Sequence, residues 1–273
     1  MSTAIETIHP DASAAQARVA LFDFDGTLSL IRAGWVDVMV PMMTEGLLET
    51  RSGESEGELR TIVEEYVGRL TGRQTIYQMI EYAQQIERRG GRPRDPLEYK
   101  RDYLDRLGLK IRDRIEGLRR GEFAPDAFLV PGARALLEAL AERGLTLYLA
   151  SGTDQVYMRE EAELLDVARY FDGNVFGALD DYKSFSKKIL IERIIRESDF
   201  RGDEFLGFGD GFVEIENVKE VGGVAVGAAT AEPDCLEVDE VKRRRLIAVG
   251  ADWIVPHYRD RDALLAALFA EPR

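Results

Sequence analysis

VALFDFDGT, at residues 19–27, is an apolar run that ends in two carboxylates and a Gly-Thr pair. The apolar residues are typical of a short buried β-strand, and Gly26-Thr27 indicates a tight turn after it. On an ideal strand the side chains of Asp23 and Asp25 would lie on one face, because successive residues alternate. Two like charges at one point need a positive partner, and a hard divalent cation such as Mg²⁺ suits carboxylate oxygens. The stretch therefore predicts a metal site at the end of a strand.

The rest of the chain alternates between strand-like and helix-like segments. Further short apolar runs of strand character lie at residues 145–151, 174–179, 205–210, 223–229 and 253–258. Segments of helical period lie between or after them, at residues 133–143, 186–197 and 263–269. Strands that alternate with helices favour a parallel sheet covered on both faces. We therefore predict an α/β fold with a doubly wound parallel sheet, and we expect its ligands at the carboxyl ends of the strands.

Residues 31–123 break this alternation, since apolar residues recur there at steps of three and four without a convincing strand. We expect them to form a second, smaller, all-helical domain. It would be inserted into the sheet domain, which would comprise residues 18–30 and 124–273. Residues 1–17 show no strong period and are expected to be a disordered or loosely held N-terminal tail.

The composition limits the classes of protein and of site. The 273 residues are 45% hydrophobic with a formal net charge of −14, so we expect a globular protein with no nucleic-acid partner. No apolar run is long enough to cross a bilayer and the N-terminus lacks a signal-peptide pattern, which favours a cytoplasmic location and no membrane partner. Cys235 is the single cysteine, so a metal site would use oxygen ligands, or His9 or His257. The basic run at residues 242–245 is interpreted as a solvated helix face.

D-x-D-G-T after an apolar strand resembles the first motif of the haloacid dehalogenase superfamily, and later segments match its other motifs in order. Ser151, at the end of LTLYLAS, matches the second motif, a strand-terminal Ser or Thr that binds the transferring phosphoryl group. The third motif is a lysine near a helix start. Lys187 is the choice, because its spacing from Asp210 is similar to that in small-molecule phosphatases of the superfamily, while Lys188 remains an alternative and Lys183 lies in the same region. The inserted helical domain stands where the family carries a helical cap of the C1 type.

GDGFVE, at residues 209–214, resembles the fourth motif, GDG-x-x-D. Glu214 stands where a second aspartate is commoner, so we expect it to hold a metal-bound water. The resemblance implies that Mg²⁺ is held by the carboxylates of Asp23 and Asp210 and by the backbone carbonyl of Asp25. The groups implied to bind phosphate are Thr27, Ser151, Gly152 and Lys187.

The resemblance also implies a phosphohydrolase mechanism. Asp23 would attack phosphorus and form an aspartyl-phosphate. Asp25 would protonate the leaving group and then deprotonate the attacking water. An acid at position 25 separates this chain from the dehalogenases of the superfamily, whose halide leaves without a proton. The expected activity is Mg²⁺-dependent removal of phosphate from a small phosphorylated metabolite.

Other functions were weighed against the same motifs. A phosphotransferase, such as a sugar-phosphate mutase, would pass the phosphoryl group to another hydroxyl instead of water. A catalytically idle phosphate-ligand-binding module is disfavoured, because both aspartates of the first motif are present. A dinucleotide-binding dehydrogenase is excluded, because no G-x-G-x-x-G follows the first strand. The sequence does not indicate an oligomeric state.

Substrate choice is expected to reside in the helical domain, because the sheet domain recognises only phosphate. The polar or aromatic residues that are candidates for contacting the substrate are Arg32, Trp35, Arg73, Gln74 and Gln78. For each of them an ordinary surface or packing role is at least as good an interpretation.

Overall fold

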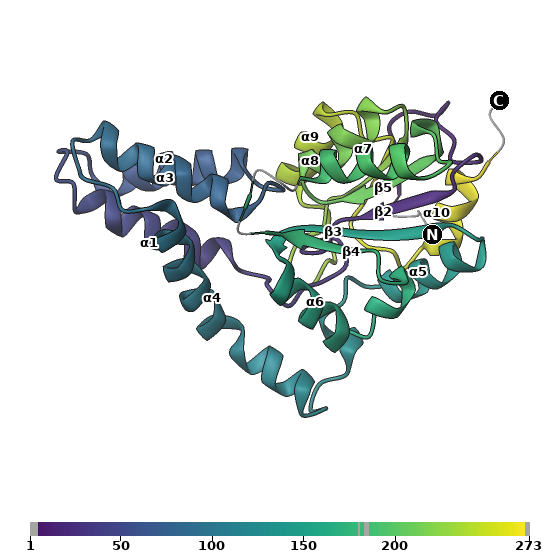
Figure 1. Cartoon of the computed structure of the whole chain (residues 1–273), viewed down its shortest axis with the longest axis horizontal. Coiled ribbons are helices and arrows are strands. Elements are labelled where there is room, and N and C mark those ends of the chain that lie inside the picture. Colours follow the sequence, from purple (N-terminus) through teal and green to yellow (C-terminus); the bar gives the residue numbers. More distant parts are fainter. Residues whose placement is uncertain (1–4, 180, 183–185, 271–273) are drawn as a thin grey trace. The chain divides into compact units, whose positions relative to one another are not determined.

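The computed structural model describes residues 5–179, 181–182 and 186–270 (Figure 1). The chain divides into two compact units, of which one comprises Met1–Ala33 with Arg114–Arg273 and the other comprises Gly34–Asp113. The first unit contains the sheet and the second is helical. Within the described residues, no helix combines the length and the apolar character that a membrane span requires.

The sheet unit is built on a single sheet whose strands follow the order β1-β7-β6-β5-β2-β3-β4. Its strands are β1 (Glu6–Thr7), β2 (Val19–Phe22), β3 (Thr146–Asp154), β4 (Val175–Ala178), β5 (Phe205–Gly209), β6 (Val224–Ala228) and β7 (Trp253–Val255). Every neighbouring pair is parallel except β1 with β7. The predicted doubly wound α/β fold is therefore confirmed, and each predicted strand segment overlaps one of the parallel strands, although β3 continues three residues beyond the predicted 145–151.

Helices cover both faces of this sheet. Figure 1 shows α7, α8 and α9 over one face and α5, α6 and α10 over the other. These helices are α5 (Ala133–Glu142), α6 (Gln155–Leu164), α7 (Lys187–Glu197), α8 (Phe212–Glu220), α9 (Glu240–Ala248) and α10 (Arg261–Leu268). Short 3-10 helices lie among the described connections, namely η1 (Pro125–Phe128), η2 (Ala168–Phe171) and η3 (Gly202–Glu204). Two covered faces explain why the strands are apolar throughout rather than alternating with polar residues.

The strand order places the motif-bearing strands side by side. β2 lies between β3 and β5, with Phe22 in register with Leu149 of β3 and Phe208 of β5. The rings of Phe22 and Phe208 stack with centroids 4.5 Å apart, and both are fully buried. Because all three strands are parallel, the residues that follow their carboxyl ends meet at one edge of the sheet.

The N-terminal segment is held against the sheet, so the expectation of a loose tail is wrong for the residues from 5 to 17. β1 pairs antiparallel with β7, and the Ile8 amide donates to the Asp252 carbonyl at 2.9 Å. Ala14 is only 2% exposed. The physical reason is that β7 would otherwise present an unpaired strand edge, which even a two-residue strand can partly satisfy. A strand this short leaves no periodic signal in the sequence.

Side-chain caps fix the starts of two helices that supply lysines to the site. Ser186 Oγ accepts a hydrogen bond from the Ile189 amide at 3.1 Å, so α7 begins at Lys187. Asp239 caps α9 and accepts from the Lys242 amide at 2.9 Å. Ser and Asp are favoured at this position because their oxygens satisfy amides that lack a partner within the helix. Lys187 and Lys242 therefore each lie in the first turn of their helix.

The helical unit, all of whose residues from 34 to 113 are described, contains no strand, in line with the expected all-helical insertion. Its helices are α1 (Val36–Leu48), α2 (Glu56–Arg69), α3 (Thr75–Arg88) and most of α4 (Pro96–Arg119). A capping box between Ser55 and Glu58 starts α2. The unit has its own core, in which Met43 and Met79 are fully buried and the Tyr66 hydroxyl donates to Met43 Sδ at 3.1 Å. Its bounds lie slightly inside the expected 31–123.

Candidate active site

The first motif lies at the carboxyl end of β2, in the middle of the sheet. The Asp23 amide donates to the Phe208 carbonyl at 2.9 Å, which ties the residue to β5, and Asp23 is 5% exposed. The chain then turns at Gly26, whose φ of +73° lies in the left-handed region. An ideal Cβ on Gly26 would stand 2.3 Å from Asp210 Oδ2, so only glycine fits between the first and fourth motifs.

Lys187 is the lysine that reaches the first motif. Its Nζ lies 2.6 Å from Asp23 Oδ1, and it also forms an ion pair with the buried Glu214 on α8. Lys188 points elsewhere, since its exposed ammonium pairs with Glu220 at 2.7 Å. Lys183, the third lysine of this region, lies outside the described residues. The structure therefore places Lys187, and not Lys188, beside the expected nucleophile.

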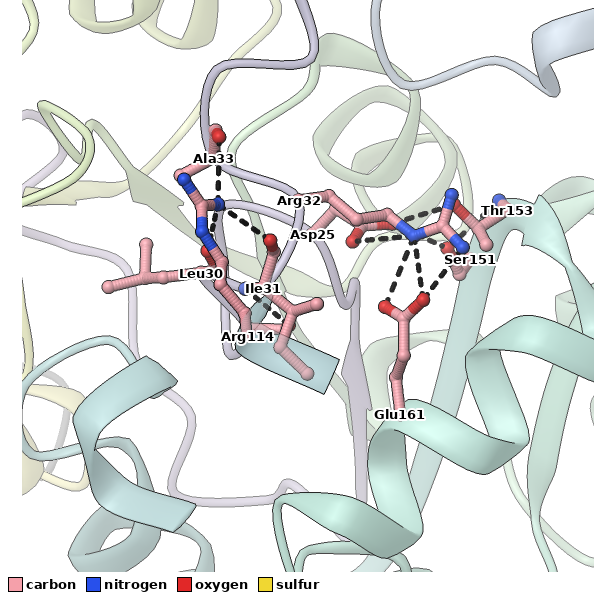
Figure 2. A network of polar contacts seen from close by, with 10 residues as sticks. Asp25, Leu30, Ile31, Arg32, Ala33, Arg114, Ser151, Thr153 and Glu161 are labelled. Carbon is pink, nitrogen blue, oxygen red and sulfur yellow. Dashed lines mark hydrogen bonds and ion pairs between the residues drawn. The ribbon is translucent and has the colours of Figure 1, made fainter. Parts of the chain in front are cut away.

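The carboxylate of Asp25 is held by two hydroxyls from β3 (Figure 2). Thr153 Oγ1 donates to Asp25 Oδ2 at 2.8 Å, and Ser151 Oγ lies 3.3 Å from the same oxygen. Ser151 Oγ in turn accepts from the Thr153 amide at 3.0 Å. Ser151 is among the residues predicted from the motifs, whereas Thr153 is not, although the two residues stand two positions apart on one strand and so share a face.

Arg32 and Glu161 form a buried ion pair next to Asp25 (Figure 2). Arg32 Nε lies 4.0 Å from Asp25 Oδ1, and its guanidinium contacts both carboxylate oxygens of Glu161, which lies on α6. The loop that carries Arg32 is fixed by Arg114, whose Nη1 donates to the carbonyls of Ile31 and Ala33 at 2.7 and 2.9 Å. Arg32 thus lies in the sheet unit beside the first motif. Whether it contacts substrate stays a prediction.

The fourth motif meets the first through Thr27 and Asp210. The Asp210 amide donates to Thr27 Oγ1 at 2.9 Å, so the Thr27 hydroxyl holds the two motifs together. The Asp210 carboxylate lies next to Lys242 of α9, with Oδ2 and Nζ 2.8 Å apart. Gly152 follows Ser151 on β3, as the resemblance requires. The phosphate contacts implied for Thr27, Ser151, Gly152 and Lys187 stay predictions.

Lys242 is a further member of the site that sequence reasoning missed. Its Nζ also lies 2.8 Å from Glu232 Oε1 and 3.0 Å from Thr230 Oγ1. The interpretation of residues 242–245 as a solvated helix face is therefore wrong for Lys242, whose side chain is 19% exposed. The basic run gives no sign of this, because Lys242 in the first turn of α9 reaches the sheet edge while Arg244 and Arg245 are exposed.

Burial and like charges raise the pKa values of both aspartates in the first motif. Burial raises the pKa of Asp23 to about 7; the Lys187 ammonium opposes this shift, and the charges of Asp210 and Asp25 add to it. Burial likewise raises the pKa of Asp25 to about 6, opposed by Arg32 and reinforced by Glu161 and Asp210. The Asp210 carboxylate therefore disfavours the ionised forms of both aspartates of the first motif.

These residues fit a hard divalent cation. Carboxylate and carbonyl oxygens are the donors that Mg²⁺ prefers, and the buried Asp23 and the largely buried Asp210 supply two carboxylates at this edge of the sheet. No three acidic, histidine or cysteine side chains form a ready cluster in the part of the chain that the structure describes. The expected ligand set does not need one, because it consists of two carboxylates, those of Asp23 and Asp210, and the backbone carbonyl of Asp25.

The other candidate substrate residues belong to the helical unit. Gln74 and Gln78 are 5% and 4% exposed, and Gln78 Nε2 lies 3.5 Å from the Val67 carbonyl. The Arg73 guanidinium lies over the Tyr77 ring, 6.0 Å from its centroid. Trp35 directly precedes α1. These contacts are internal to the helical unit, and a role for the four residues in substrate binding stays a prediction.

A comparison with known protein families identifies the family of this chain. The family profile described as haloacid dehalogenase-like hydrolase matches residues 17–222, which include all four motifs. The chain belongs to this family of hydrolases. The resemblance noted in the sequence is thereby confirmed. A search of curated proteins found no match for this hydrolase.

Solved structures of the same fold resemble the hydrolase over nearly its whole length. A phosphatase predicted for Clostridium acetobutylicum has 18% identity and a TM-score of 0.57, with 92% of this chain and 99% of that chain covered. A HAD family hydrolase from Deinococcus radiodurans, with bound phosphate and sodium, has 14% identity and a TM-score of 0.54, covering 95% and 100%. A candidate beta-phosphoglucomutase from Bacteroides vulgatus has 16% identity and a TM-score of 0.52, covering 94% and 92%. At such identities the likeness concerns the fold alone.

Proposed function

We propose that this hydrolase removes phosphate from a small phosphorylated metabolite through an aspartyl-phosphate on Asp23, with Mg²⁺ as its metal. The observation that carries the proposal is the placement of Lys187 Nζ 2.6 Å from Asp23 Oδ1, while Asp25 stands two residues away under hydrogen bonds from β3. A nucleophile, a cation beside it and a separate acid are the parts that a phosphoryl transfer needs.

Asp23 would act as the nucleophile. Its carboxylate attacks phosphorus, a new phosphorus–oxygen bond forms, and the bond to the leaving oxygen breaks. The buried Lys187 ammonium favours the ionised form of Asp23 against burial and neutralises negative charge on the phosphate oxygens. Glu214, which pairs with Lys187 from the other side, fixes the position of this ammonium.

Asp25 would transfer the protons. It gives a proton to the leaving alkoxide and later takes one from the water that hydrolyses the aspartyl-phosphate. Its pKa of about 6 makes both protonation states accessible near neutral pH. The hydroxyls of Thr153 and Ser151 hold Oδ2, so the carboxyl group keeps one orientation through both steps.

The metal would be held by Asp23, Asp210 and the backbone carbonyl of Asp25. When bound, Mg²⁺ supplies positive charge to the phosphate oxygens on which the transition state concentrates negative charge. The unit formed by Gly34–Asp113 would serve as the cap that shields the reaction from water. A cap restricts access to the site, which favours small metabolites over phosphoproteins.

The test is phosphate release from p-nitrophenyl phosphate and from a panel of sugar, nucleotide and polyol phosphates, with and without Mg²⁺. The native chain is compared with Asp23→Asn, and circular dichroism checks that the variant is folded. Mg²⁺-dependent turnover that disappears in the variant supports the proposal. Undiminished turnover in Asp23→Asn contradicts it. If the native chain turns over none of these substrates until a second hydroxyl compound is added, the result would favour phosphotransfer.

A further inference from the structure

Lys242 forms an ion pair with a residue that the proposed function assigns to the metal. Its Nζ lies 2.8 Å from Asp210 Oδ2 and, on its other side, 2.8 Å from Glu232 Oε1. The side chain of Asp210 is 10% exposed and that of Glu232 is 19% exposed. One half-buried ammonium is therefore shared between two carboxylates, of which only Asp210 belongs to a family motif.

The second carboxylate is built into the same turn as the first. An ideal Cβ on Gly26 would stand 2.3 Å from Asp210 Oδ2 and 3.0 Å from Glu232 Oε1, so both carboxylates pack against the turn of the first motif. Thr230 Oγ1 donates to the Gly26 carbonyl at 2.7 Å and accepts from Lys242 Nζ at 3.0 Å. Lys242 can consequently leave one carboxylate and keep the other with little movement of its backbone.

A divalent cation and an ammonium repel each other strongly when they share one carboxylate. Asp210 cannot offer its full charge to a metal while Lys242 remains on Oδ2. Glu232 offers the ammonium a partner that is already in contact with it. The Lys242 ammonium thus competes with the metal for Asp210, and Glu232 is a second carboxylate that can hold this ammonium when the metal binds.

We propose that Lys242 is a tethered counter-ion of Asp210, which neutralises this carboxylate without metal and moves fully onto Glu232 when the metal binds. Lys242 lowers the affinity of the site for Mg²⁺, and Glu232 raises it by accepting the displaced ammonium. Both are positioning residues, because they act through Asp210. This inference rests on the proposed function, since it takes Asp210 as a metal ligand.

The test measures Mg²⁺ binding directly, by isothermal titration calorimetry without substrate. Lys242→Met is expected to bind Mg²⁺ about tenfold more tightly than the native chain, and Glu232→Gln about tenfold more weakly, which is the scale of effects from groups that position metal ligands. The double variant distinguishes movement of the Lys242 ammonium onto Glu232 from a direct effect of the Glu232 charge on the metal. If Glu232 acts by receiving Lys242, then Glu232→Gln has no further effect in the Lys242→Met background. Additive effects of the two substitutions would overturn the proposal.

Thermal unfolding gives a second readout with a matched control. Lys242→Met should lower the unfolding temperature more in EDTA, where it leaves both Asp210 and Glu232 without the ammonium, than in saturating Mg²⁺, where the metal neutralises Asp210 and only Glu232 loses its partner. The control is Lys219→Met, because Lys219 pairs with buried Asp252 at 2.9 Å away from the site. That variant should lose the same stability in both conditions. An equal loss in both conditions for Lys242→Met would overturn the inference and leave Lys242 a purely structural residue.

Failure of the inference differs visibly from failure of the proposed function. If the native chain binds no Mg²⁺ at millimolar concentration, the metal assignment fails and the inference fails with it. If the native chain binds Mg²⁺ and Lys242→Met binds it equally well, only the role of Lys242 is refuted.

Discussion

Arg32 and Glu161 form a buried, two-pronged ion pair that links the loop after the first motif to α6. Arg32 Nε lies 3.0 and 3.1 Å from the two carboxylate oxygens of Glu161, and Nη2 lies 2.7 Å from Oε1. The two side chains are 9% and 4% exposed. Since Arg32 also stands 4.0 Å from Asp25, the pair sets the charge around the expected general acid.

Glu161→Gln should destabilise the protein by up to about 3–5 kcal/mol, because it removes the two-pronged counter-charge of the buried Arg32 guanidinium and leaves the Asp25 carboxylate at the longer distance of 4.0 Å. Replacing both residues, as Arg32→Met with Glu161→Met, should recover most of that loss. The measurement is urea unfolding of the single and double variants. Glu64→Gln is the control, since Glu64 pairs with Arg60 on the exposed face of α2 and its loss should cost under about 1 kcal/mol. Equal losses for Glu161→Gln and Glu64→Gln would show that the pair does not stabilise the fold.

Gly26→Ala should weaken Mg²⁺ binding by at least about tenfold, because the added methyl group would displace the Asp210 carboxylate from its place. Gly144→Ala is the matched control. Gly144 has a similar φ of +82° but nothing within 4 Å of an added Cβ, so it reports backbone strain alone, at about 1–2 kcal/mol. Calorimetric Mg²⁺ binding and urea unfolding of both variants separate the two effects. Normal Mg²⁺ binding by Gly26→Ala would contradict the assignment of Asp210 as a ligand.

The parts of the fold that could be predicted are those whose own residues form a clear pattern in the sequence. Apolar runs next to turn residues marked the parallel strands, and the order of the motifs placed Asp23, Ser151 and Asp210 at neighbouring strand ends. β1 could not be predicted, because two residues carry no period and are held by contacts that are distant in the sequence, the pairing with β7 and the ion pair of Glu6 with Arg243.

The site residues that could not be predicted belong to the site because of contacts with residues far away in the sequence. Glu161 belongs to no motif in the sequence, yet it is 3% exposed and pairs with Arg32, which lies 129 residues earlier in the chain. Lys242 was hidden within a basic run and becomes part of the site only through Asp210. Thr153 is the exception, since its position two residues after Ser151 on the same strand was a usable signal.

Lys187→Met should reduce kcat/KM by about 10²–10³, the loss typical when a group that stabilises developing negative charge is removed. The neighbouring Lys188→Met is the control and should retain native activity, because Lys188 is exposed and pairs with Glu220. Steady-state kinetics in saturating Mg²⁺ give the comparison, after circular dichroism has confirmed that both variants are folded. A larger loss in Lys188→Met than in Lys187→Met would reverse the assignment of the third motif.

Mg²⁺ should stabilise the protein more at pH 8 than at pH 6. Burial raises the pKa of Asp23 to about 7 in the metal-free protein, so below this pH a proton competes with the metal for the carboxylate. The unfolded chain has the ordinary aspartate pKa of about 3.9, so the folded state binds the proton more tightly. Metal-free stability must then fall as the pH rises from about 4 through 7, and Mg²⁺ should remove that loss.

Thermal unfolding from pH 5 to 8, in EDTA and in saturating Mg²⁺, measures this dependence. Asp23→Asn is the control, because an amide does not titrate and the variant should lose the part of the pH dependence that lies near pH 7 in EDTA. The fall that remains, between about pH 4 and 6, includes the contribution of Asp25, whose pKa burial raises to about 6. A native stability in EDTA that rises between pH 6 and 8 would mean that Asp23 is already ionised at pH 6, with Lys187 outweighing burial.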